Sequence, residues 1–235
     1  MIFDAHSGWH LPDGEAHLQG WMRGVAMESH GRLTYQREKY LAALEHCPRR
    51  AVAVDVGAHV GLWSWQMSFD FDRVIAFEPM PAHRDCWRVN LADRPDCHLE
   101  GIALGAAGGM AWLAARTPGS SGDTGVEPLG ATIAGAVPVD QRTLDSFHLP
   151  RCDLLKIDCE GYELFVLQGA QATLRRCRPT VIVEQKPETG MVARYGIVVM
   201  DAVELLIGIG YRVERAIQGD YIMTPPGVAQ PGASA

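Results

Sequence analysis

Short apolar runs alternate with amphipathic segments along most of the chain. Residues 51–56 form a continuous, partly β-branched apolar run with a single acid near its end, which predicts a strand buried on both faces of a parallel sheet. Similar runs end at Glu78, at Asp158 and at Glu184. Because segments of helical periodicity separate these runs, we predict a doubly wound α/β sheet with right-handed crossovers. Ligands of such a sheet bind beyond the carboxyl ends of its strands.

The same periodicity assigns most of the remaining elements. We predict strands at 51–56, 73–77, 97–104, 110–114, 153–158, 180–184, 211–216 and 221–224, and helices at 33–47, 60–69, 81–92, 162–176 and 199–208. A turn at 218–220 joins the last two strands into a C-terminal β-hairpin. Residues 106–138 break the rhythm, and we expect the glycine-rich loop within 115–131 to fold over the site as a lid.

The two ends of the chain differ from this core in composition. Residues 1–32 show weak periodicity, and we predict a loop-rich extension with one short helix. The extension either caps an acceptor site or forms a subunit contact in a homo-oligomer. The side chains available for this are His6, Trp9, His10, His17 and Trp21. Residues 33–224 then form one domain, and the Pro/Gly/Ala-rich tail 225–235 is expected to be flexible.

Composition and charge exclude several classes of protein. Lys and Arg total 21 against 28 Asp and Glu, a net charge of -7, whereas a general nucleic-acid binder needs clustered positive charge. No apolar run approaches the roughly 20 residues that cross a bilayer, and the N-terminus lacks the pattern of a signal peptide. The six cysteines are scattered singly, as is typical of reduced thiols. We therefore expect a cytoplasmic protein with no nucleic-acid or membrane partner.

The strongest motif follows the first predicted strand, in the sequence Asp-Val-Gly-Ala-His-Val-Gly of residues 55–61. Gly57 and Gly61 allow a sharp turn and a close approach of a ligand to the backbone. His59 lies inside the same loop. The second strand ends about twenty residues later at Glu78, where a carboxylate can accept both hydroxyls of a ribose. The alternative to a cofactor site is that the glycines serve only the packing of the turn and that Glu78 is a solvated acid at a strand end.

The acid at the start of this motif bears on the kind of cofactor. Asp55 would repel a diphosphate and attract a sulfonium or ammonium group, so the pair of Asp55 and Glu78 favours S-adenosylmethionine over NAD. The spacing also lacks the third glycine of a dinucleotide fingerprint. Two alternatives stay open: an NAD-dependent oxidoreductase, and a catalytically silent protein that keeps the fold as a binding scaffold.

A second motif, residues 156–163, begins inside a later predicted strand. Side chains alternate along a strand, so Lys156, Asp158 and Glu160 point to the same side. A lysine within an apolar strand needs a partner, and a purely structural ion pair with a carboxylate would satisfy it. Asp158 stands at the carboxyl end, where it could hold a cofactor amine or accept a substrate proton. Cys159 is expected on the opposite side as an inert core thiol.

Taken together, these motifs resemble the FkbM family of S-adenosylmethionine-dependent methyltransferases. The matching segments are 51–61, 76–79, 143–145, 155–163 and 183–184, spread over residues 33–224. The Lys-Ile-Asp-x-Glu-Gly-x-Glu string is fairly specific to this family. The resemblance implies a Rossmann-like class I methyltransferase fold with a mostly parallel seven-stranded sheet. It also implies methylation of a hydroxyl oxygen on a sugar or another small molecule.

The resemblance further implies roles for individual residues. The cofactor site would contain Asp55, Gly57, Gly61, Glu78 and Asp158, to which we add Ala58 and His59 from the same loop. Removal of the acceptor proton needs a base, for which Asp158 and Glu160 are the candidates. The segments without matching motifs, residues 1–30 and 115–131, are where selectivity for the acceptor would be built.

A divalent metal offers a second scheme for activating the acceptor. Asp158, Glu184 and Gln185 would supply two carboxylates and an amide to one crevice, an oxygen set that suits Mg²⁺ and would lower the pKa of a bound hydroxyl. This layout is similar to that of catechol-type methyltransferases. Glu184 could equally be a capping or ion-paired acid, so a metal-free and a magnesium-dependent scheme both stay open.

Overall fold

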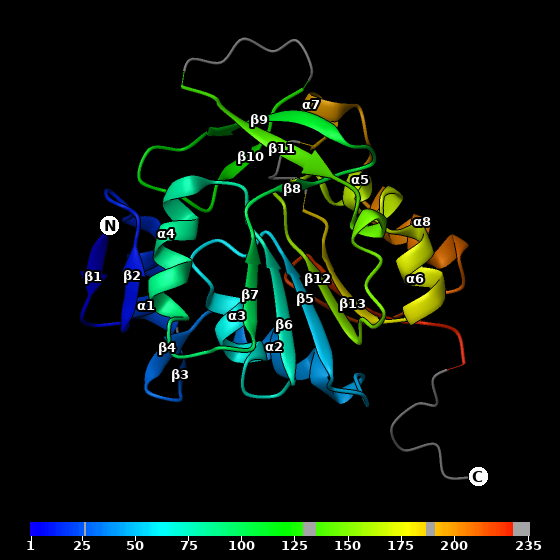
Figure 1. Ribbon diagram of the computed structural model, residues 1–235, viewed down its shortest axis with the longest axis horizontal. Coiled ribbons are helices and arrows are strands. Elements are labelled where there is room, and N and C mark those ends of the chain that lie inside the picture. Colours follow the sequence, from blue (N-terminus) through cyan, green and yellow to red (C-terminus); the bar gives the residue numbers. More distant parts are fainter. Residues whose placement is uncertain (26, 129–134, 187–190, 228–235) are drawn as a thin grey trace.

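A seven-stranded sheet forms the centre of the computed structural model, which describes residues 1–25, 27–128, 135–186 and 191–227 (Figure 1). In spatial order its strands are β14 (Arg212–Ile217), β15 (Asp220–Thr224), β13 (Thr180–Glu184), β12 (Leu154–Ile157), β5 (Val52–Val56), β6 (Arg73–Phe77) and β7 (Cys97–Glu100). The strands from β13 to β7 run parallel, whereas β15 runs antiparallel to β13 and forms a hairpin with β14. The predicted doubly wound sheet with a C-terminal antiparallel hairpin is confirmed.

Helices cover both faces of this sheet, because its central strands are apolar on both sides. The helical segments are α1 (His17–Val25), α2 (Arg37–Glu45), α3 (Leu62–Met67), α4 (Pro81–Asn90), η1 (Leu144–Phe147), α5 (Glu163–Gln168), α6 (Gln171–Cys177), α7 (Met191–Tyr195) and α8 (Asp201–Gly208). Helices α5, α6 and α8 pack on the face that contains Val54 and Leu155. Helices α2 and α3 pack on the opposite face, which contains Ala53 and Leu154.

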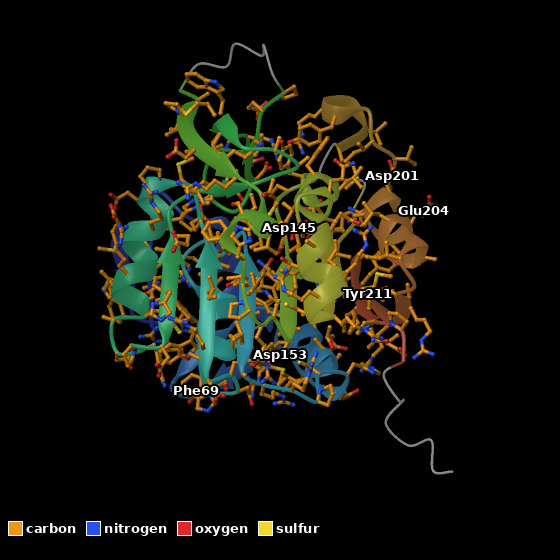
Figure 2. The ribbon with its side chains drawn as sticks, turned by 45° about the vertical axis from the view of Figure 1, so that its right-hand side comes forward. Phe69, Asp145, Asp153, Asp201, Glu204 and Tyr211 are labelled. Atoms are coloured by element: carbon orange, nitrogen blue, oxygen red, sulfur yellow. The ribbon has the colours of Figure 1, made fainter. Side chains whose placement is uncertain are left out.

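The helix predicted at 162–176 is in fact two helices, α5 and α6, that meet at Gly169. A Cβ atom on Gly169 would lie 2.0 Å from the carbonyl oxygen of Gly105, so the break falls where two backbones touch. Asp145 caps the second helix, because its carboxylate accepts hydrogen bonds from the amides of Ala172 (2.8 Å) and Thr173 (2.7 Å) (Figure 2). The motif at 143–145 therefore has a structural role here.

A second sheet covers the carboxyl ends of the central strands (Figure 1). Its strands, in spatial order, are β10 (Thr124–Val126), β9 (Gly109–Ala115), β11 (Val137–Arg142) and β8 (Ala103–Leu104). The strand predicted at 110–114 is confirmed as β9, but the strand predicted at 97–104 divides into β7 and β8. We expected an irregular excursion in this region, but the structure contains two further strands, β10 and β11. Strand β10 is short, and β11 carries Pro138 and Asp140 at exposed positions. Residues 129–131 of the predicted lid lie outside the described residues.

The N-terminal extension packs on α3 and α4. The predicted short helix is confirmed as α1, whereas two hairpins were too short for periodicity to reveal: β1 (Ile2–Asp4) with β2 (Trp9–Leu11), and β3 (Met27–Ser29) with β4 (Arg32–Thr34). Trp9 is fully buried. The Arg32 guanidinium lies 4.9 Å from the ring centroid of Trp9 and 3.9 Å from that of Trp65, so cation–π contacts fasten the extension to α3.

Two further expectations concern cysteines and membranes. All six cysteines lie in the described part of the chain and none is in a disulfide, as expected; Cys47, Cys86, Cys152 and Cys177 are buried. Within the described residues, no helix has the length and apolar character needed to span a bilayer. Most of the predicted flexible tail, residues 228–235, lies outside the described residues, and the division into domains stays a prediction.

A buried ion pair stands at the centre of the main sheet. Lys156 on β12 is the register neighbour of Asp55 on β5, and its Nζ lies 3.2 Å from Asp55 Oδ1. Both side chains are at most 4% exposed. The alternation of side chains along two parallel strands thus supplies the partner that a buried lysine requires.

Loss of one member of this pair should destabilise the fold. We expect Lys156→Met to lower the free energy of unfolding by about 3–5 kcal/mol, because the Asp55 charge would remain buried without its partner. Lys156→Met combined with Asp55→Asn removes both charges and should recover a large part of this loss. Chemical denaturation measures both effects, and equal losses in the single and double variants would contradict the prediction.

Candidate active site

A cavity of about 460 Å³ lies between the carboxyl ends of the central strands and the second sheet. Its wall combines residues from the glycine loop (residues 57–61, between β5 and α3), from the ends of β6, β12 and β13, from the hairpin of β9 and β10, and from the N-terminal extension. The lining includes Glu15, His17, Leu18, Tyr35, Gly57, His59, Glu78, His83, Asp158, Cys159, Glu160, Glu184 and Lys186. The cavity therefore lies where a doubly wound sheet binds its ligands.

The glycine loop is held between β6 and β12. The amides of Gly57 and Ala58 donate to the Phe77 carbonyl at 3.0 and 3.1 Å. Gly57 has φ 73°, and a Cβ atom there would lie 1.9 Å from the Asp158 carbonyl oxygen. Lys156 Nζ donates to the Gly57 carbonyl at 2.8 Å. Only glycine fits at position 57, since the backbone is left-handed and touches the end of β12.

Asp55 lies beneath this loop rather than in the cavity wall. It is fully buried, accepts a hydrogen bond from Ser64 Oγ at 2.7 Å and pairs with Lys156. Burial alone would lower the pKa of Lys156, but the Asp55 and Asp158 carboxylates outweigh burial and raise it. The direct cofactor contact of Asp55 stays a prediction, while its observed contacts hold the loop in place.

Glu78 presents a carboxylate at the opposite side of the loop. Its oxygens accept hydrogen bonds from the amides of His59 (2.7 Å) and Met80 (2.8 Å), and His83 Nδ1 lies 3.2 Å away. Burial would raise the pKa of Glu78, but the His83 charge and these donors outweigh burial and lower it. An ionised carboxylate with further acceptor capacity is suited to bind the hydroxyls of a ribose.

Three carboxyl groups meet at the other end of the cavity. Each of Asp158, Glu160 and Glu184 places an oxygen within 4.8 Å of the other two. Burial, followed by repulsion from Asp158, raises the pKa of Glu160 to about 8. The same two causes raise the pKa of Glu184 to about 9, against the attraction of Lys186, with which Glu184 forms an ion pair. The candidate catalytic residues Asp158 and Glu160 are therefore brought together, and Glu184 joins them.

The third member of the predicted magnesium set is used elsewhere. Gln185 accepts hydrogen bonds from the amides of Met200 and Ala202 at 3.0 and 3.2 Å, which caps α8, and it does not line the cavity. Its expected place in the crevice is therefore wrong, because local capping claims the amide. A magnesium requirement stays a prediction.

Two arginines outside the sequence motifs hold the turn that carries Glu160. Glu160 has φ 54°, and its carbonyl accepts hydrogen bonds from Arg194 Nη2 on α7 at 2.8 Å and from Arg116 Nη1 after β9 at 3.4 Å. These contacts stabilise a left-handed turn that a non-glycine residue rarely adopts. Cys159, in the same turn, contributes to the cavity lining and also packs against the main hydrophobic core, and burial raises the pKa of its thiol well above the ordinary value.

Several residues of the cavity wall were not predicted from the sequence. Lys186 follows Glu184 at the end of β13, so its position near the site was a usable signal. Tyr35 and Glu15 lie in segments without a motif, and no spacing connects them to the glycine loop. Of the extension's aromatic and histidine residues, His17 lines the cavity, whereas Trp9 is buried against α3.

Several known proteins are similar to this chain. Methyltransferase sdnD of Sordaria araneosa is 29% identical over 191 residues, which cover 63% of this chain and 73% of that protein. The crystal structure of methyltransferase FkbM from Methylobacillus flagellatus KT is 17% identical with a TM-score of 0.48, covering 74% of this chain and 43% of that chain. The chain thus spans less than half the length of that solved protein. N-methyltransferase NodS from Bradyrhizobium japonicum WM9, in complex with S-adenosyl-L-homocysteine, is 9% identical with a TM-score of 0.45, covering 80% and 85% of the two chains.

A family model identifies the central part of the sequence. The model of the methyltransferase FkbM domain matches residues 55–206, a segment that contains the glycine loop, Glu78 and the three carboxyl groups. These matches favour neither an NAD-dependent oxidoreductase nor a silent scaffold. The sheet has the strand order and the antiparallel edge described above, which is the class I methyltransferase fold. The chain belongs to the FkbM methyltransferase family.

Proposed function

We propose that the protein transfers a methyl group from S-adenosylmethionine to a hydroxyl oxygen of a small molecule such as a sugar. The observation that carries the proposal is the division of one cavity into two ends. An ionised Glu78 beside the glycine turn suits the ribose of the cofactor, and a cluster of carboxyl groups at the other end suits proton removal. Membership of the FkbM methyltransferase family supports this assignment.

The cofactor would lie across the glycine loop. Glu78 would accept the ribose hydroxyls, and Gly57 and His59, which line the cavity, would contact the cofactor along the turn. Ala58, predicted at the same site, is instead buried in a hydrophobic cluster and does not line the cavity. Asp158 would attract the ammonium group of the methionine part. Carboxylates in a low-dielectric cavity stabilise the cationic cofactor more than its neutral product, since methyl transfer converts the sulfonium into a thioether.

The transfer step requires alignment of the acceptor oxygen and removal of its proton. A bond forms between the acceptor oxygen and the methyl carbon while the carbon–sulfur bond breaks and its electron pair stays on sulfur. The proton passes to a carboxylate of the cluster, and we assign Glu160 as this base with Asp158 beside it. Magnesium bound by the same cluster would instead lower the pKa of the acceptor hydroxyl, and activity that survives EDTA would favour the carboxylate scheme.

The cofactor end of the cavity can be tested through Glu78. We expect Glu78→Gln to weaken binding of S-adenosylhomocysteine by about 10- to 100-fold, because hydrogen bonds to a charged group contribute about 1.5–3 kcal/mol. Titration calorimetry measures the affinity. Glu100→Gln, an exposed acid at the end of the neighbouring strand, is the matched control and should bind as the unchanged protein does. Failure of the unchanged protein to bind would contradict the proposed cofactor.

The reaction itself can be tested with a labelled cofactor. Incubation with S-adenosylmethionine labelled in its methyl group and a panel of monosaccharides and polyols should yield a methyl ether in at least one case. With that acceptor, Glu160→Gln should lower kcat by roughly 10²–10⁴-fold while the affinity for S-adenosylhomocysteine stays within twofold. Exposed Glu204→Gln serves as the control. Label recovered on nitrogen instead of oxygen, from a panel that also contains amines, would refute O-methylation.

The pH dependence of the reaction tests Glu160 as the base. Glu160 accepts a proton only when ionised, and its raised pKa of about 8 means that the ionised form gains population as the pH rises through this value. We therefore expect kcat/KM to increase from pH 6 to pH 9 with an apparent pKa near 8. Glu160→Gln should abolish this dependence. A pH profile that is flat over this range, or that is unchanged in the variant, would assign the base elsewhere.

A further inference from the structure

Three side chains from distant segments form a hydrogen-bonded chain that ends at the glycine loop. Glu15 comes from the connection between β2 and α1, Ser121 from the loop between β9 and β10, and His59 from the glycine loop. Ser121 donates its amide to Glu15 Oε2 at 2.6 Å and its hydroxyl to the same oxygen. His59 Nε2 lies 2.7 Å from Ser121 Oγ. Glu15 is only 3% exposed.

Backbone hydrogen bonds reinforce the contact between these three side chains. The Gly119 carbonyl accepts hydrogen bonds from the amides of Ala16 and His17 at 2.9 and 3.0 Å. The N-terminal extension and the loop between β9 and β10 therefore contact each other through main-chain and side-chain bonds. Both segments line the cavity, through Glu15 and His17 on one side and Gly122 on the other, so together they form its cover.

Counting the hydrogens shared by Glu15, Ser121 and His59 assigns the tautomer of His59. The Glu15 oxygens accept the amide hydrogen of Leu18 at 2.7 Å and both Ser121 hydrogens, so Glu15 acts as an acceptor. A serine hydroxyl has one hydrogen, and Ser121 gives it to Glu15. The Ser121 oxygen can then only accept from His59, which requires a hydrogen on His59 Nε2.

The other ring nitrogen of His59 is consequently an acceptor. Burial, followed by the charges of His83 and Lys156, lowers the pKa of His59 well below its ordinary value, so the ring is neutral and carries its single hydrogen on Nε2. None of the hydrogen bonds among the described residues involves His59 Nδ1. The amide of the same residue donates to Glu78 Oε2, so this free acceptor belongs to the residue next to the ribose-binding carboxylate.

We propose that Glu15 and Ser121 are positioning residues that fix His59 as the Nε2–H tautomer, so that Nδ1 accepts a hydrogen bond from a ribose hydroxyl of the bound cofactor. The inference rests on the proposed function, because it takes the cavity as the site of S-adenosylmethionine. It adds that the cover of the cavity and the cofactor contact are one hydrogen-bonded unit. Release of the cofactor then requires the Ser121 contacts to open.

The tautomer can be observed without any ligand. In protein labelled with ¹⁵N-histidine, a long-range ¹H–¹⁵N spectrum distinguishes the two tautomers, and His59→Asn identifies the resonances of His59. We expect the Nε2–H pattern in the unchanged protein and a loss of this single pattern in Ser121→Ala. Ser29→Ala is the matched control, because it removes an exposed serine–histidine hydrogen bond to His30 of 2.8 Å and should leave His59 unaffected. An Nδ1–H pattern in the unchanged protein would overturn the proposal.

Calorimetry and stopped-flow release with S-adenosylhomocysteine then test the link to the cofactor. We expect Ser121→Ala and Glu15→Gln to weaken binding about tenfold and to accelerate release, a loss that corresponds to about 1.4 kcal/mol. Ser121→Thr retains the hydroxyl and should restore tight binding, which separates a lost contact from a damaged fold. Failure of the unchanged protein to bind contradicts the proposed function. Tight binding by Ser121→Ala, with binding intact in the unchanged protein, overturns this inference alone.

Discussion

The contact between the glycine loop and the end of β12 is the constraint on which the site depends. Gly57 approaches the Asp158 carbonyl so closely that no side chain fits between them. Lys156 reinforces the contact, because its ammonium group binds the Gly57 carbonyl and pairs with Asp55. The cofactor end and the carboxyl cluster are thereby held at a fixed separation, which a direct methyl transfer requires.

The central architecture could be predicted from the sequence because its signals are local. Apolar runs of β-branched residues defined the strands. Because Glu78 and Asp158 stand at the ends of such runs, they could be placed at the carboxyl edge of the sheet. Contacts made across the second sheet had no such signal: its strands are short, and β11 carries a proline. The predicted position of Gln185 was wrong because a polar residue after a strand serves equally well as a cap for a helix that comes later in the chain.

Lysine side chains behind the cavity offset part of the negative charge around the acidic cluster. Lys186 pairs with Glu184 and lies 3.9 Å from Asp220 Oδ2, and Lys39 on α2 pairs with the same aspartate. These ion pairs connect α2, β13 and β15 behind the cavity. Burial and repulsion from Asp158 nevertheless raise the pKa of Glu160 to about 8 and that of Glu184 to about 9, and a cationic ligand in the cavity would lower both values.

Two different parts of the chain build the cavity wall. The segment that matches the family model begins at residue 55, yet Glu15, His17, Leu18 and Tyr35 line the cavity from the chain before it. The shape of the pocket is therefore not determined by the family motifs alone. Relatives with identical motifs need not share the same pocket.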